Sequence, residues 1–183
     1  MPASPQPGAR PQIVLETERL TLRYLTDDDV ESILAVIGDP ETMKYYPQPV
    51  DRDGAQRWIN RSLEHYQTDG HGLFAVVLKS TGEVIGDCGL MRQEVDGESL
   101  LEVGYHLRRD HWGHGYATEA AQACMKHAFR HLAADKVVSL IRPENVPSRR
   151  VAERNGMLVE RQVTFHGLPH LMYAMRREDY GQA

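Results

Sequence analysis

The chain has 183 residues, of which 41% are hydrophobic and 26% charged, and its formal net charge at pH 7 is −5. This composition is ordinary for a globular protein and excludes collagen-like, low-complexity and strongly disordered classes. An acidic excess leaves no basic field to neutralise phosphates, so we expect no nucleic acid among the partners.

The N-terminal end is predicted to lie outside the fold. Residues 1–12 are rich in Pro, Ala and Gln and lack the apolar segment of a signal peptide, so we expect a disordered tail there and one domain over residues 13–183. The longest apolar run, residues 73–78, is too short to cross a bilayer. We therefore expect a cytoplasmic protein with no membrane partner. Cys88 and Cys124 have no metal or disulfide spacing, which predicts buried, reduced thiols.

The first third of the domain predicts one strand and two helices. Apolar and polar residues alternate over residues 20–25, as in a half-buried strand. Residues 26–38 combine an N-capping threonine, an acidic first turn and apolar residues at helical spacing. A second helix is expected from Asp51 or Asp53 to the residues before Gly70.

The remaining patterns predict six strands and two helices. These are strands over residues 73–79, 84–92 and 100–107, a helix over 116–134, a strand over 137–141, a helix over 147–156, and strands over 158–165 and 171–175. The full order is then βααβββαβαββ. It predicts an α/β domain with a mixed, mostly antiparallel sheet flanked by helices.

A glycine-rich turn carries the strongest functional signal. Residues 112–117 read WGHGYA and lie between a predicted strand and the long helix. Glycines let the backbone approach a ligand closely, and the free N–H groups of a helix N-terminus bind anions such as a pyrophosphate. The alternative is a turn that only reverses the chain, but the small residues that open the helix favour a binding site.

This stretch resembles the cofactor loop of the GNAT superfamily of acetyltransferases. Residues 112–120, WGHGYATEA, are similar to the RimJ/RimL-like branch, although Trp112 stands where the general pattern has Gln or Arg. Residues 16–23, 102–105 and 145–152 also match that branch, in order. The resemblance implies the GNAT fold, acetyl-CoA as co-substrate without a metal, and an amine acceptor.

The resemblance also implies which residues contact acetyl-CoA. Backbone N–H groups near Val103 and Gly104 are expected to polarise the thioester carbonyl. Asn145 is expected on the pantetheine arm, or as a turn residue beside Pro147. The expected cofactor-binding residues are Val103, Gly104, Trp112, Gly113, His114, Gly115, Tyr116, Ala117, Thr118, Asn145, Ser148 and Arg149. For Arg149 and its neighbour Arg150, solvated surface arginines are the alternative to a contact with the 3′-phosphate.

Glu102 is the candidate catalytic base. A lysine-like amine with a pKa of ~10.4 requires about 4.6 kcal/mol to lose its proton at pH 7, so a base is useful. Glu102 interrupts an apolar run on the strand leading to the glycine turn, and the resemblance implies the same role. The alternatives are a surface glutamate or an ion pair with an arginine; Asp87 is a weaker candidate base.

Ser148 is the candidate acid for the departing thiolate. Many relatives use a tyrosine at the position that is Ala152 here, and Ser148 matches the serine of the RimJ/RimL-type pattern. Capping of the helix near Pro147 is the alternative role for Ser148.

Aromatic residues are candidates for an acceptor pocket, although core packing is the usual role of such residues. The candidates are Tyr45, Tyr46, Trp58, Phe74 and Tyr105, and we assign Tyr45 and Tyr105 to substrate binding. The nine histidines and two cysteines show no zinc-ligand spacing, so no metal is expected.

These observations predict an N-acetyltransferase that moves acetyl from acetyl-CoA to a protein N-terminus or a small-molecule amine by direct attack in a ternary complex. A non-catalytic acetyl-CoA sensor is the alternative, suggested by Ala152, and an unrelated phosphate-binding domain is a third. The expected partners are acetyl-CoA and the amine, with the chain a monomer or homodimer.

Overall fold

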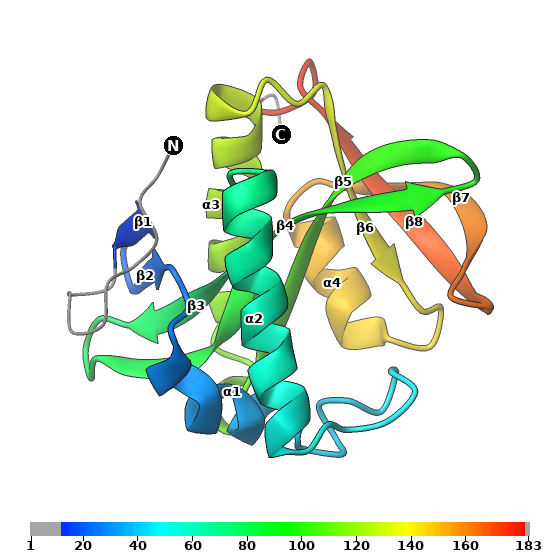
Figure 1. Ribbon diagram of the computed structural model, residues 1–183. Coiled ribbons are helices and arrows are strands. Elements are labelled where there is room, and N and C mark those ends of the chain that lie inside the picture. The colour runs from blue at the N-terminus through cyan, green and yellow to red at the C-terminus, as the bar shows by residue number, and fades with distance from the viewer. Residues whose placement is uncertain (1–11, 182–183) are drawn as a thin grey trace.

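A single mixed sheet organises the protein, as the computed structural model shows for residues 12–181 (Figure 1). Its eight strands follow the order β1-β2-β3-β4-β5-β6-β8-β7, and every neighbouring pair is antiparallel except β5 and β6. The strands are β1 Ile13–Glu16, β2 Leu20–Arg23, β3 Leu73–Leu78, β4 Glu83–Val95, β5 Glu98–Leu107, β6 Lys136–Ile141, β7 Leu158–Phe165 and β8 Leu168–Arg176. The helices are α1 Val30–Ile37, α2 Arg52–Thr68, α3 Tyr116–His131 and α4 Val146–Arg154. The predicted mixed, mostly antiparallel sheet flanked by helices is confirmed.

The start of the domain differs from the prediction in two details. β1 was not expected, because a four-residue segment is recognisable as a strand only through its pairing with β2. Asp27–Asp29 forms a short 3-10 helix before α1 instead of the first turn of α1 itself. Asp51 caps α2 by accepting the N–H of Gly54 at 2.7 Å, so the helix begins at the earlier of the two expected positions. Residues 1–11 of the predicted tail lie outside the described residues.

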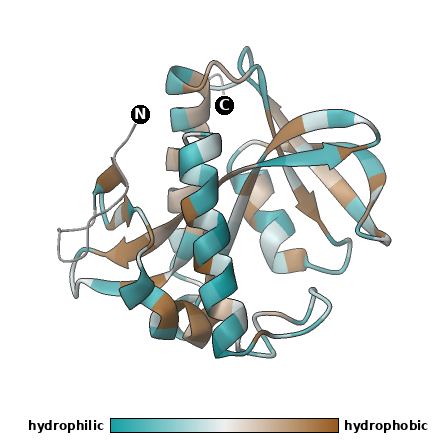
Figure 2. Cartoon of the chain, in the orientation of Figure 1, coloured by the Kyte–Doolittle hydropathy of each residue, from teal (hydrophilic) through white to brown (hydrophobic). Residues whose placement is uncertain are grey.

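Strand alternation divides the core into two layers. On β3, Phe74 and Val76 pack with α3, while Leu73 and Ala75 pack with α1 and α2 on the opposite face. Figure 2 shows hydrophilic residues along much of the visible side of α2, as expected for a helix that covers one face of a sheet. Within residues 12–181, no helix combines the length and apolar character that crossing a bilayer requires.

The sheet opens between β5 and β6. Their register is limited to the pair Glu102↔Val138. Beyond it, side chains bridge the strands: Ser139 Oγ donates to the Val103 carbonyl at 3.1 Å, and the Leu140 N–H donates to Glu102 Oε1 at 3.2 Å. The strands therefore diverge just before the glycine turn.

Both cysteines lie in the core between the sheet and α3. Cys88 on β4 and Cys124 on α3 are fully buried and free, with their sulfur atoms 3.7 Å apart. The prediction of buried, reduced thiols is confirmed.

Candidate active site

A cavity of about 300 Å³ gathers the glycine turn, the end of β5, the start of α4 and the loop between α1 and α2. In Figure 1 this loop reaches towards α4. The predicted site residues that line the cavity are Tyr45, Tyr105, Trp112, Gly113, Gly115, Tyr116, Ala117, Thr118, Asn145 and Ser148. Segments far apart in the sequence therefore meet at one opening.

The mouth of α3 is built to receive an anion. Gly115 caps the helix with φ +81°, and Gly113 has φ +79°, a left-handed conformation that glycine adopts without strain. The first N–H of α3 that donates a helical hydrogen bond is that of Glu119, which bonds to the Gly115 carbonyl at 3.0 Å. The preceding amides therefore remain available, and the helix dipole favours negative charge beside them.

Thr118 supplies a further donor at the same place. Its hydroxyl is buried and, within residues 12–181, has no hydrogen-bond partner, although Thr118 lines the cavity. A buried hydroxyl without a partner is costly and points to a ligand. Together with the free amides, it fits the diphosphate of coenzyme A.

The loop between β1 and β2 fixes this turn in place. The Glu119 carboxylate accepts hydrogen bonds from Thr17 Oγ1 at 2.6 Å and from Arg19 Nε at 2.7 Å. Arg19 also donates to the His114 carbonyl at 2.9 Å and stacks 4.6 Å from the ring centroid of Tyr116. Burial acts to raise the pKa of Glu119, but hydrogen bonds from Thr17 and Arg19 lower it below its ordinary value.

Four predicted cofactor residues lie outside the cavity lining, namely Val103, Gly104, His114 and Arg149. The His114 side chain is exposed and stacks on Tyr116, with ring centroids 5.6 Å apart. Arg149 is partly exposed and bonds within the protein instead, donating to Tyr173 Oη and to the Pro143 carbonyl, both at 3.1 Å. Arg150 lines the cavity in its place, because neighbouring residues on a helix project in different directions.

Asn145, and not Ser148, caps α4. Its side-chain oxygen accepts the Ser148 N–H at 3.2 Å, so the alternative capping role considered for Ser148 is wrong. The Ser148 hydroxyl makes no hydrogen bond within the described residues and remains free at the cavity wall. Tyr105 donates to the Ser148 carbonyl at 3.0 Å, and burial raises the pKa of Tyr105. Tyr105 thereby links β5 to α4 across the opening in the sheet.

Glu102 is enclosed within the sheet and does not line the cavity. It is 8% exposed and accepts hydrogen bonds from Gln93 Nε2 at 2.8 Å and from the Leu140 N–H. The surface and arginine-pair alternatives are therefore wrong. Burial raises the pKa of Glu102, against the lowering effects of these hydrogen bonds and of His106. Its role as the base stays a prediction.

Sequence reasoning missed a polar cluster on the α1/α2 face of the sheet. His106 Nδ1 lies 2.8 Å from Asp87 Oδ1, and His106 Nε2 lies 2.7 Å from the Tyr46 hydroxyl. Trp58 Nε1 donates to Asp87 Oδ2 at 2.7 Å. Tyr46 and His106 line the cavity, whereas Phe74, another aromatic candidate, is buried in the core.

The hairpin itself holds a signal for this cluster. Its turn at Asp96 and Gly97 is recognisable from the sequence, and the β4–β5 register is regular outwards from that turn. Equal counting along both strands therefore places Asp87 opposite His106.

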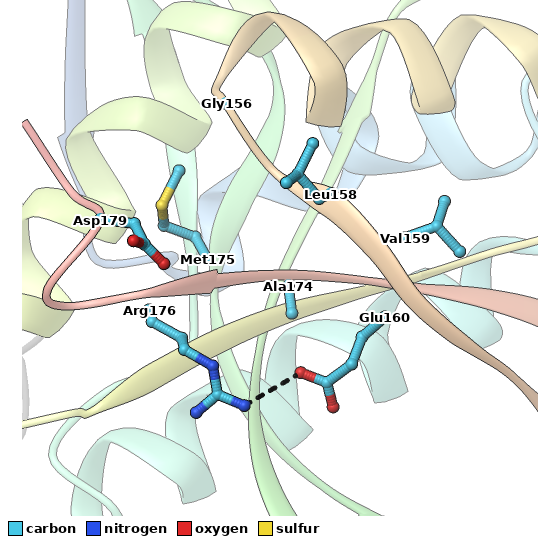
Figure 3. Close-up of a pocket in the computed structure, with 8 residues that line it drawn as sticks. All are labelled: Gly156, Leu158, Val159, Glu160, Ala174, Met175, Arg176 and Asp179. Carbon is cyan, nitrogen blue, oxygen red and sulfur yellow. Dashed lines mark hydrogen bonds and ion pairs between the residues drawn. The ribbon is translucent and has the colours of Figure 1, made fainter. Parts of the chain in front are cut away.

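A second hollow, of about 420 Å³, lies along β7 and β8 (Figure 3). It contains the ion pair of Arg176 with Glu160 at 3.5 Å and an exposed Leu158. None of the predicted site residues lines it, so we place the candidate site in the first cavity.

Similarity to known sequences and structures agrees with this geometry. Residues 19–158 match the family model of the acetyltransferase (GNAT) domain. The uncharacterized protein YkkB of Bacillus subtilis is 34% identical over 160 residues, 87% of this chain and 93% of YkkB. The crystal structure of an acetyltransferase from Agrobacterium tumefaciens superposes with a TM-score of 0.78 at 30% identity, over 94% of this chain and 99% of that one. A structure of RimL, a ribosomal L7/L12 alpha-N-protein acetyltransferase in complex with coenzyme A, shares the fold at 18% identity, with a TM-score of 0.70 over 90% of this chain and 98% of that one. The match to the family model and the similarity to these relatives show that the chain belongs to the GNAT acetyltransferase family.

Proposed function

We propose that this protein transfers the acetyl group of acetyl-CoA to a primary amine, by direct attack of the amine while both substrates are bound. The observation that carries the proposal is the helix mouth of α3, where free amides and the unpartnered Thr118 hydroxyl face one cavity. The diphosphate would bind there, with the pantetheine arm passing Asn145 towards the gap between β5 and β6. Two kinds of acceptor are compatible with this arrangement. One is a protein N-terminus, as in the RimJ/RimL-like branch, and the other is a small-molecule amine.

The alternation of β5 indicates which amide would polarise the thioester. The Val103 carbonyl faces β6, since it accepts from Ser139. Leu101, Val103 and Tyr105 therefore present their backbone groups on that side, and Gly104 presents its own to β4. The register ends at Glu102↔Val138, so Tyr105 is the first residue whose amide faces the gap beyond it. We assign this amide the role predicted for the Val103 and Gly104 region.

The transfer requires one base and one acid. The neutral amine attacks the carbonyl carbon, the carbon–sulfur bond breaks, and the thiolate takes a proton. Ser148 is our candidate donor, because its hydroxyl is free at the cavity wall. Glu102 remains the predicted base. Because Glu102 does not line the cavity, its role should be compared experimentally with that of a side chain that does.

The sensor alternative rests on Ala152. This residue is buried in the core and offers no hydroxyl at the position where many relatives have tyrosine. A sensor would bind acetyl-CoA without consuming it.

Two measurements test the proposal. Acetyl-CoA at about 100 times its dissociation constant should add about 2.7 kcal/mol of stability, raising the Tm by several degrees. Inorganic phosphate at the same concentration is the control, because a general phosphate-binding domain would respond to it. Free thiol released with a panel of peptides and small amines then separates enzyme from sensor. A Tm shift without thiol release from any amine would contradict transfer.

The predicted cytoplasmic location and the choice between monomer and homodimer stay predictions. Light scattering of the purified chain, with and without acetyl-CoA, decides the oligomeric state.

A further inference from the structure

We propose that Asp87, His106 and Tyr46 form a proton relay that accepts the proton of the acceptor amine. The inference rests on the proposed acetyl transfer and assigns its base. The three side chains come from β4, β5 and the loop between α1 and α2, and they lead from the buried sheet to the cavity.

Hydrogen bonding fixes the direction of the relay. Asp87 is fully buried, and each of its oxygens has a nitrogen partner, Trp58 Nε1 or His106 Nδ1. The indole N–H is only a donor, which marks the Asp87 carboxylate as the acceptor of the cluster. His106 then carries its proton on Nδ1, and its Nε2 lone pair accepts from the Tyr46 hydroxyl.

Tyr46 connects this buried pair to the acceptor. The residue is 41% exposed, yet its hydroxyl lies 2.7 Å from His106 Nε2. Burial of that hydroxyl raises the pKa of Tyr46, and the negative charges of Glu102 and Asp87 raise it further. A hydroxyl of this kind stays protonated and can pass a proton on to His106 without holding a charge itself.

Two carboxylates lie on the same face of the sheet as His106, and the charged residues Glu41, Lys44, Arg150 and Arg154 line the cavity with it. Asp87 faces it from β4, and Glu102 lies on the same face of β5, separated from it by Gly104. Trp58 of α2 packs edge-on against the imidazole at 5.2 Å between ring centroids. The imidazolium formed in the relay would therefore lie beside Asp87, its hydrogen-bonded carboxylate partner.

The proton balance is complete without a further reactant. The substrate ammonium gives one proton to Tyr46 Oη as the Tyr46 proton moves to His106 Nε2, which forms an imidazolium beside Asp87. The neutral nitrogen bonds to the acetyl carbon and the carbon–sulfur bond breaks. The second nitrogen proton goes to the thiolate through Ser148 or water, and His106 returns its proton to solvent.

His106→Gln, Tyr46→Phe and Glu102→Gln test the relay in the full chain. The probes are acetyl-CoA with spermidine and with an alanine-initiated peptide. General-base catalysis contributes about 10²–10⁴-fold. We expect a loss of kcat of that size at pH 7 in His106→Gln and Tyr46→Phe, with the Tm shift given by acetyl-CoA retained. The loss should shrink as the pH approaches the pKa of the amine, because the neutral amine needs no base.

The outcomes separate the two proposals. If the wild type releases thiol and His106→Gln releases it at the same rate at all pH values, the relay alone is overturned. A loss of rate confined to Glu102→Gln also overturns the relay alone. Absence of thiol release by the wild type with every amine overturns acetyl transfer and the relay with it. If His106→Gln does not fold, Tyr46→Phe decides, since it removes one oxygen from a partly exposed side chain: a wild-type rate in Tyr46→Phe overturns the relay.

Discussion

His106 and Asp87 are directly opposed residues of the β4–β5 hairpin whose side chains also bond to each other, with Nδ1 and Oδ1 2.8 Å apart. Cross-strand partners on one face lie close enough for such contacts. The pair lies within the sheet itself, so its geometry follows from strand register and needs no loop to hold it. Only Tyr46, from the loop, completes the connection to the cavity.

The Trp58 indole should stabilise the fold through Asp87. Trp58→Phe removes the N–H that satisfies Asp87 Oδ2 and leaves a buried carboxylate oxygen without a donor. Such a loss costs about 1–3 kcal/mol, and each kcal/mol lowers the Tm of a chain of this size by about 2–4 °C. Trp112→Phe is the matched control. It frees the Leu107 carbonyl, but Trp112 is 39% exposed, so water can donate the lost hydrogen bond. Equal Tm losses in the two variants would contradict a special role for Asp87.

Gly115→Ala should weaken acetyl-CoA binding through backbone strain. A left-handed conformation costs a non-glycine residue about 1–2 kcal/mol, and the nearest atom to an added Cβ, Arg19 Nη2 at 3.5 Å, causes no clash. Gly167→Ala places the same strain, at φ +75°, in the turn between β7 and β8. Both variants should lose similar stability, but only Gly115→Ala should also lose acetyl-CoA affinity, measured by calorimetry. A parallel loss of affinity in both would refute this reading of the turn.

Thr118→Val should change stability and affinity in opposite directions. The free protein loses a buried hydroxyl that has no partner within the described residues, so its Tm should rise or stay unchanged. Acetyl-CoA should bind about 10-fold or more weakly, since a hydrogen bond to a charged group contributes about 1.5–3 kcal/mol. Thr164→Val, on an exposed position of β7, serves as control. Unchanged affinity would exclude Thr118 as a phosphate ligand.

Glu102 should make stability depend on pH. Burial raises its pKa, so the native protein keeps a proton that the unfolded chain releases above the ordinary value of 4.5. The wild type should therefore lose stability as the pH rises from about that value through the raised pKa. Glu102→Gln lacks this loss, so its Tm relative to the wild type should increase with pH. Exposed Glu64→Gln on α2 controls for the removed charge. A constant difference from pH 4 to 8 would contradict the raised pKa.

Local patterns predicted the fold well, since each long element has its own periodicity and caps. β1 was missed because four residues carry little pattern and depend on β2 for their identity. The glycine turn was also recognisable, because its glycines, its helix and its position between elements are all local in sequence.

Side-chain partnerships were harder to predict. Tyr46 and His106 are 60 positions apart, and Trp58 and Asp87 are 29 apart, so their contacts depend on how α2 and its preceding loop pack on the sheet. The choice between Arg149 and Arg150 depends on the rotation of α4, which no composition reveals. The enclosure of Glu102 similarly depends on β6, which approaches from a distant part of the chain.

The sparse pairing of β5 with β6 has a consequence for the resistance of the protein to proteolysis. One backbone pair and two side-chain bonds connect these strands, whereas every other pair of neighbours in the sheet has three or more register pairs. Acetyl-CoA bound along β5 would stabilise the contact between β5 and β6. Proteases act on molecules in which such contacts have opened. The protein should therefore be cleaved more slowly by proteases when acetyl-CoA is bound than when it is absent.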